Sequence, residues 1–107
     1  MAKLVALYKK PSNPAEFDDK YFNEHVPLAS KIPGLQHMEV SKVNSSPMGE
    51  TEWYLIAELT FESMDALKEG MSSPEGKTAG KNVMSFAKDI VTMLFVEEEK
   101  VPAGAGK

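Results

Sequence analysis

The sequence has no cysteine among its 107 residues. Disulfide bonds, thiolate nucleophiles, iron–sulfur clusters and zinc sites with cysteine ligands are therefore excluded. It has only two histidines, His25 and His37, and their spacing matches none of the helical zinc motifs. We therefore expect no bound metal, unless carboxylates and one histidine are brought together by the fold.

Positive charge and long hydrophobic runs are also scarce. Twelve basic residues stand against sixteen acidic ones, and the net charge is −4. A nucleic-acid-binding protein needs a basic face to neutralise phosphates, so that class is disfavoured. Only five residues separate Lys3 from Lys9, whereas a signal peptide needs an apolar run of about 7–15 residues and a membrane helix about 20. We expect no membrane segment and a cytoplasmic location.

What is present is the composition of a folded domain. Hydrophobic residues make up 42% of the chain and charged residues 26%, which is ordinary globular usage. A chain of this length is typical of one compact domain. We expect a single domain over residues 1–100, followed by a flexible tail, 101–107, that carries Pro102, Gly104 and Gly106.

The first helix has the clearest start signal. Asn13 suits the N-cap, Pro14 suits the first helical position, and Glu16 can complete a capping box. Four of its residues, spaced by four, four and three positions, fall on one mostly apolar face of the helix. That face carries Phe17, Tyr21, His25 and Leu28. Pro27 cannot donate to the carbonyl of Asn23, so the helix should end or kink there.

The rest of the chain reads as short strands and helices. Strands are expected at 4–8, 35–43, 53–61 and 90–96, and helices at 64–69 and from 74 to about 88, with the second weakened by Gly76 and Gly80. The order strand, helix, strand, strand, helix, strand predicts an α+β fold, the ferredoxin-like βαββαβ sandwich.

Alternation along the strands predicts which residues face the helices. Trp53, Leu55, Ala57, Leu59 and Phe61 form a wholly apolar set that should pack under them. The opposite sheet face would then carry Val5, Leu7, Tyr54, Ile56, Val91, Met93 and Phe95. That is too much apolar surface for a monomer. We therefore expect a homodimer closed face to face into an α/β barrel.

His25 is the strongest candidate for chemistry. It lies one turn beyond Tyr21 on the apolar face, two residues before the helix break at Pro27. A partly buried imidazole beside a phenol suits acid–base work on a phenol or carbonyl. The alternative is structural: His25 would cap carbonyls that Pro27 leaves free, and Tyr21 would be a core tyrosine with its hydroxyl at the rim.

Three other features of the sequence are weaker evidence for function. The stretch from Gly70 to Thr78 looks like a phosphate-binding loop, but five residues separate its glycines where the motif has four. Glu58, in the middle of a strand, could be a base inside a barrel, although an ion pair with a lysine or a dimer contact explains it better. His37 should be solvated on a strand.

Two stretches together resemble the EthD family. The first is Phe17-x-x-x-Tyr21-x-x-x-His25-x-Pro27-Leu28, followed by Ile32-Pro33-Gly34-Leu35. The second is Met71-Ser-Ser-Pro74-Glu75-Gly76, followed by Phe86. The resemblance covers nearly all the chain up to about Glu98. Where this chain has Asn82, the family commonly has an aspartate, so a role for that carboxylate is in doubt here.

The resemblance implies a dimeric α/β barrel with a ferredoxin-like protomer, in agreement with the element order. The family is named after ethyl tert-butyl ether degradation, where its member accompanies an oxidative system. Related barrels include cofactor-independent monooxygenases, isomerases and cyclases. Of the family's residues, only His25, Tyr21 and the break at Pro27 carry over to this chain, the two side chains as catalytic candidates.

Three functional hypotheses follow. The first is an enzyme without a cofactor, an oxidoreductase or an isomerase or lyase of oxidative catabolism, that acts on a small hydrophobic compound. Its substrate would contact Phe17, Leu28, Trp53 and Phe86, His25 would move a proton, and Tyr21 would orient a substrate oxygen. The second is a carrier without chemistry of its own that serves an oxygenase system. The third and weakest is a haem protein with His25 as axial ligand.

Overall fold

The computed structural model describes residues 1–102 of the chain. Its elements are β1 (Ala2–Lys9), α1 (Pro14–Lys20), the π-helical turn η1 (Tyr21–His25), α2 (Val26–Ala29), β2 (His37–Lys42), β3 (Trp53–Phe61), α3 (Met64–Ser72), α4 (Pro74–Ala87) and β4 (Val91–Glu97). This order confirms the predicted α+β class. The expected tail continues into residues 103–107, which lie outside the described residues.

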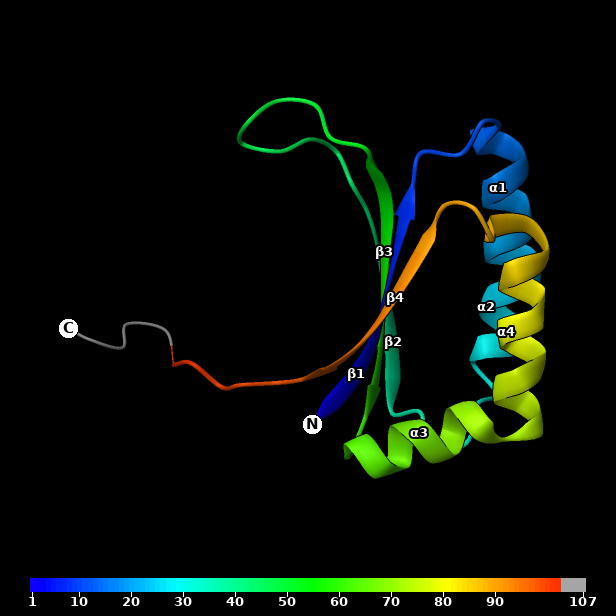
Figure 1. Cartoon of the computed structure of the whole chain (residues 1–107), viewed down its shortest axis with the longest axis vertical. Helices are drawn as coiled ribbons and strands as arrows, with labels where there is room; N and C mark the ends of the chain where they lie inside the picture. The colour runs from blue at the N-terminus through cyan, green and yellow to red at the C-terminus, as the bar shows by residue number, and fades with distance from the viewer. Residues whose placement is uncertain (103–107) are drawn as a thin grey trace.

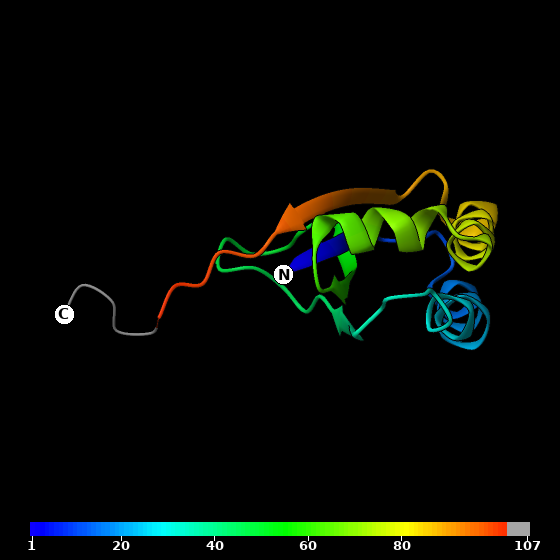
Figure 2. The same ribbon diagram turned by 90° about the horizontal axis from the view of Figure 1, so that it is seen from below.

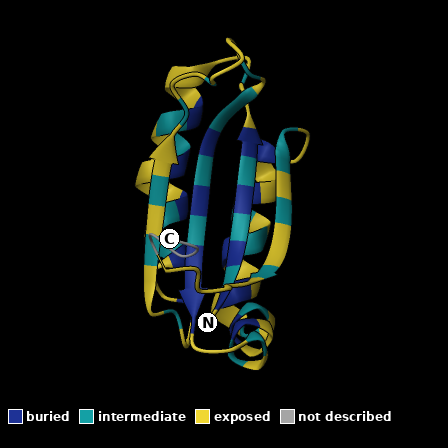
Figure 3. Cartoon of the chain, turned by 90° about the vertical axis from the view of Figure 1, so that its left-hand side faces the viewer, coloured by how far each residue is buried: buried dark blue, intermediate teal, exposed yellow. Residues whose placement is uncertain are grey.

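The four strands form one antiparallel sheet in the order β2-β3-β1-β4. Figure 1 shows the sheet nearly edge on, with α1, α2 and α4 on one side of it and α3 running across its lower end. The view from below in Figure 2 shows the same layer of helices beside α3. The other face of the sheet, seen in Figure 3, is bare. This is the predicted ferredoxin-like βαββαβ arrangement.

The core lies between the sheet and the helices. Alternate residues of the two central strands are buried there, and the register pairs Leu4 with Leu59 and Ala6 with Ala57. Short alanines at the centre of both strands let the helices approach the sheet closely. Leu67 of α3 and Val83 of α4 complete this layer and are almost wholly buried.

A β-bulge at the start of β3 overturns part of the predicted strand alternation. Tyr8 pairs with Leu55, but the next residue, Lys9, pairs with Trp53, so Tyr54 is an extra residue. Its ring lies 5.7 Å from that of Phe17 on α1. Trp53 lies instead beneath the Lys9 ammonium, 6.0 Å from the ring centroid. The prediction that Trp53 faces the helices and Tyr54 the bare face is wrong because the bulge reverses both.

The faces of β4 are also the reverse of those predicted. Pairing with β1 sets Phe95 opposite Leu4, Met93 opposite Ala6 and Val91 opposite Tyr8, all on the helix side. The bare face receives Thr92, Leu94 and Val96 instead. The apolar residues of this strand are nearly continuous, so its own pattern could not decide between the faces; its register with β1 does.

The first helix begins as predicted. The Asn13 side chain accepts a hydrogen bond from the backbone of Glu16 at 3.1 Å, with Pro14 at the first helical position. The Glu16 carboxylate does not return to the cap as a capping box would; it lies 3.6 Å from the ammonium of Lys20.

The expected break at Pro27 takes the form of a wider turn. The helix widens through η1, where the Val26 amide donates to the Tyr21 carbonyl five residues back, and continues to Ala29. The π-helical turn accommodates the hydrogen bond that Pro27 cannot make.

The second helical segment has a sharp corner. Ser63 and Ser73 cap α3 and α4 through their side-chain oxygens, at 3.1 and 3.0 Å. Helix α3 runs on to Ser72, beyond its predicted end, and α4 is continuous through Gly76 and Gly80. At the corner a Cβ atom on Gly76 would lie 2.7 Å from the carbonyl oxygen of Met71. Only glycine allows this close approach of the two helices.

No helix within residues 1–102 is long and apolar enough to cross a membrane.

Candidate functional site

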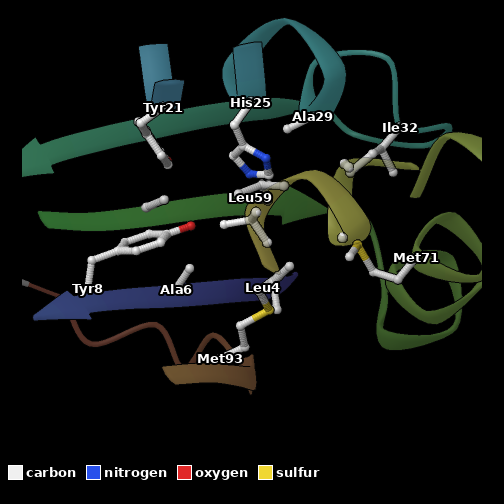
Figure 4. Close-up of a pocket in the computed structure, with 14 residues that line it drawn as sticks. Leu4, Ala6, Tyr8, Tyr21, His25, Ala29, Ile32, Leu59, Met71 and Met93 are labelled. Atoms are coloured by element: carbon white, nitrogen blue, oxygen red, sulfur yellow. The ribbon is translucent and has the colours of Figure 1, made fainter. Parts of the chain in front are cut away.

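A cavity of about 30 Å³ lies between the helices and the two central strands. Figure 4 shows its residues converging from β1, β3, β4 and the helices. Its walls are almost wholly apolar. Its polar groups come from Tyr8, Tyr21 and His25, and the thioethers of Met71 and Met93 flank it. The volume matches the share of one water molecule in the liquid, roughly 30 Å³.

The π-helical turn delivers two of these side chains. Tyr21 and His25 are four residues apart, and their ring centroids lie 5.4 Å from each other. Tyr21 is completely buried, and His25 is 8% exposed. Turns of this kind recur at functional sites because they redirect side chains without ending the helix. The structure therefore brings together the two catalytic candidates that the sequence indicates.

Asn82 of α4 orients the imidazole of His25. Its Oδ1 atom lies 3.2 Å from Nδ1 of His25. With the amide oxygen on that side, Nδ1 donates its hydrogen, and Nε2 keeps its lone pair. Burial lowers the pKa of His25, and the hydrogen bond to Asn82 opposes this in part. The imidazole is therefore neutral near pH 7 and equipped to accept a proton at Nε2.

Tyr8 is the site residue that sequence reasoning missed. Its ring lies 5.3 Å from that of Tyr21, and Figure 4 shows its hydroxyl pointing into the cavity. Burial is the main cause that raises the pKa of both phenols well above the usual value, so both stay protonated as hydrogen-bond donors. One signal was present: Tyr8 continues the alternation of Leu4 and Ala6 toward the helix side.

The four residues predicted to contact a substrate do not line this cavity. Phe17 stacks on Tyr21 with ring centroids 5.6 Å apart, and Phe86 packs against Phe17 at 5.7 Å. Phe17 thus packs against both tyrosines, and Phe86 packs against Phe17 and His25. Leu28 borders a separate hollow of about 170 Å³ between α2 and the start of α4. Trp53 lies on the bare face. Their roles in binding stay predictions.

Two other polar candidates lie on the bare face. Glu58 is 3.3 Å from the ammonium of Lys3, which is the ion pair that sequence reasoning favoured for it. His37 is exposed on β2, 3.9 Å from the carboxylate of Glu39. Neither reaches the cavity.

The side chains present do not suit a metal or a haem. Within residues 1–102, no three histidine, aspartate or glutamate side chains cluster closely enough to hold a metal ion. A porphyrin is many times larger than the cavity beside His25. The haem hypothesis therefore has no support in this geometry.

A ferredoxin-like sheet with a small, mostly apolar cavity under its helices, lined by one histidine and two tyrosines, places the chain among small α+β proteins. The profile of the EthD domain matches residues 9–90. The chain belongs to the EthD family, as the two sequence stretches indicated.

Two similar proteins share nearly the whole chain. One is an uncharacterised 11.0 kDa protein in the thcB–thcC intergenic region of Rhodococcus erythropolis, 38% identical over 101 residues, which are 94% of this chain and 98% of that protein. The other is a solved structure of an EthD family protein from Bacillus halodurans, 43% identical with a TM-score of 0.90, covering 92% of this chain and 99% of the other.

More distant solved structures share the fold alone. SnoaB, a cofactor-independent oxygenase from Streptomyces nogalater, is 12% identical with a TM-score of 0.69, over 95% of this chain and 96% of its own. A dimeric ferredoxin-like protein from Jannaschia is 13% identical with a TM-score of 0.68, over 92% of this chain and 100% of its own.

Proposed function

We propose that the protein binds a small hydrophobic organic compound in the cavity and that His25 accepts a proton from it or donates one to it. The observation that carries this proposal is the neutral His25, whose Nδ1 atom lies 3.2 Å from Oδ1 of Asn82, beside a cavity with almost wholly apolar walls. The reaction class would be a cofactor-independent oxidation or an isomerase or lyase step in oxidative catabolism. The similarity in fold to an enzyme described as a cofactor-independent oxygenase supports this reading.

Ligand entry requires the cavity to widen. At about 30 Å³ it is too small for an aromatic ring. Met71 and Met93 are both only partly buried and flank it. Methionine is unbranched and adapts its shape at low energetic cost. Rotation of these two side chains is the simplest way to admit a ligand without unfolding a helix.

The homodimer belongs to the same proposal. The bare face presents an apolar centre formed by Val5, Leu7, Ile56, Leu94 and Val96. Leu94 alone is 46% exposed. Such a patch is typical of an interface. The dimeric ferredoxin-like protein of the same fold supports a second copy of this chain as the partner. The assignment of residues 1–100 to one domain and the cytoplasmic location stay predictions.

The test is native mass spectrometry and turnover with a panel of small phenols, lactones and ethers. We expect a dimer that holds one ligand per chain and converts at least one of them. His25→Gln should bind the same ligand and leave it unreacted. Conversion at an unchanged rate by His25→Gln would overturn the proposed role of His25. The matched control is His37→Gln, the other histidine, whose mass spectrum also reports whether the dimer is intact.

A carrier that serves an oxygenase system is the second candidate. Within residues 1–102, the surface that lines the cavity is almost wholly apolar, which favours binding without chemistry. In that case the wild type and His25→Gln would bind ligand equally well, and neither would convert it. The same experiment therefore separates the two candidates.

A further inference from the structure

The hydroxyl of Tyr21 is buried and has no partner in hydrogen-bonding geometry within residues 1–102. Burial raises its pKa, and the Tyr8 hydroxyl lies near enough to lower that pKa somewhat but does not meet that geometry. Its side chain lines the cavity and is completely enclosed. A hydroxyl removed from water without a compensating hydrogen bond destabilises the fold. Native proteins retain few such groups, and each calls for an explanation. The position of this one, at the wall of a cavity, points to a partner that comes from outside the chain.

Two further polar groups meet the same space. The Tyr8 hydroxyl points into it from β1, and the His25 ring reaches it from the opposite layer (Figure 4). Tyr8 and Tyr21 stay protonated and can donate hydrogen bonds, and Nε2 of His25, the ring nitrogen that does not contact Asn82, is left able to accept one. Among residues 1–102, no lysine, arginine, aspartate or glutamate lines the cavity. The site is therefore built for a neutral group that both accepts and donates hydrogen bonds.

We propose that the cavity recognises one hydroxyl oxygen of a neutral phenol or enol. Its oxygen accepts from Tyr21 and Tyr8, and its hydrogen faces Nε2 of His25. When the proton passes to Nε2, the O–H bond breaks, the electron pair stays on the ligand oxygen, and the two tyrosines hydrogen-bond to the oxyanion. This rests on the proposed function and names its substrate class.

The arrangement also defines what is rejected. A carboxylate would enter an apolar cavity as a full charge with no cation among its lining residues, which is strongly unfavourable. A hydrocarbon of the same shape would fit but leave the three polar groups unpaired. A site with buried polar groups discriminates against ligands that cannot satisfy them. The order of affinity should therefore be phenol, then toluene, then benzoate.

The test measures binding of these three probes by calorimetry to wild type, Tyr21→Phe and Tyr54→Phe. Tyr54 is the matched control, because its hydroxyl donates to Asp18 at 2.9 Å outside the cavity. We expect phenol to bind wild type about ten-fold more tightly than toluene, which is the worth of one good hydrogen bond. The preference should fall several-fold in Tyr21→Phe and persist in Tyr54→Phe.

Equal binding of phenol and toluene to wild type would overturn the inference while leaving the proposed small-molecule cavity intact. A phenol preference that survives in Tyr21→Phe would overturn it too. Binding of no probe to wild type would count against the proposed function. The wider variant Met71→Ala then keeps the inference testable, because it removes a flanking thioether and touches no polar group. A preference for phenol in that variant supports the inference, and its absence there overturns it.

Discussion

Replacing Tyr21 with phenylalanine should stabilise the protein, although it removes a group that the site uses. Phenylalanine keeps the ring that stacks on Phe17 at 5.6 Å and packs edge-on against Tyr8 at 5.3 Å. What is lost is a buried hydroxyl without a partner in the described residues. An unsatisfied buried donor costs about 1–3 kcal/mol. The small void left in its place offsets part of the gain, so a net stabilisation of about 1 kcal/mol is expected.

Urea and thermal unfolding of the ligand-free protein measure this effect. For a domain of this size, 1 kcal/mol raises Tm by about 4 °C. The control variant Tyr54→Phe loses a hydrogen bond to Asp18 and should be less stable than wild type by about 0.5–1.5 kcal/mol. A decrease in the urea midpoint of Tyr21→Phe would refute the reasoning, because it would mean that the folded protein already satisfies the hydroxyl. Stability gained together with selectivity lost is the signature of a binding residue.

Three further predictions concern the same layer of the fold. Gly80→Ala should stabilise α4 by up to about 1 kcal/mol, since no atom of the described residues lies within 4 Å of the added Cβ. Gly76→Ala should destabilise the fold by about 1–3 kcal/mol, because its added Cβ would overlap the carbonyl of Met71. Equal urea midpoints for the two variants would contradict both expectations. Burial lowers the pKa of His25, so on acidification the unfolded chain binds a proton at this residue before the folded protein does. The free energy of unfolding should therefore fall as the pH drops below about 6.5, and His25→Gln should reduce this pH dependence. Asn82→Asp should raise the pKa of His25 through a carboxylate 3.2 Å from Nδ1, which an NMR titration of the imidazole would show; an unchanged pKa would mean that residue 82 does not orient the ring.

The element order could be predicted because its signals are local. Asn13, Ser63 and Ser73 cap helices with side chains only three residues from the amides that they bind. Pro27 acts on its own helical turn. Spacing also placed Tyr21 and His25 on one helix face, since residues four apart lie one above the other. These motifs depend only on residues that are close in the sequence, so they can be recognised without knowing the rest of the fold.

The partners of these two residues could not be predicted in the same way. Asn82 lies fifty-seven positions from His25 along the chain and meets it only because α4 packs beside η1. Tyr8 reaches the cavity from a strand that pairs with β3 and β4. The alternation of Leu4, Ala6 and Tyr8 indicates that Tyr8 faces the helices, but no local pattern indicates that it meets Tyr21 there. Helical spacing and the family resemblance suggested Phe17 and Phe86 as substrate contacts, but in the fold Phe17 stacks on Tyr21 and Phe86 packs against Phe17 and His25, and neither lines the cavity.

By itself the sequence determined the fold class, the family, and the proximity of Tyr21 and His25 in the candidate site. The signals were helix caps, helical spacing and the joint motif of the two stretches. The tertiary structure alone decided the faces of β4 and of the start of β3, whereas the alternation from Leu55 to Phe61 had predicted the rest of β3 correctly. One extra residue at Tyr54 reverses Trp53, and the register of β4 with β1 turns Val91, Met93 and Phe95 toward the helices. The physical reason is that a strand's side chains alternate with a period of two, so a shift of one residue exchanges the faces, and only hydrogen bonding to the neighbouring strand sets that shift.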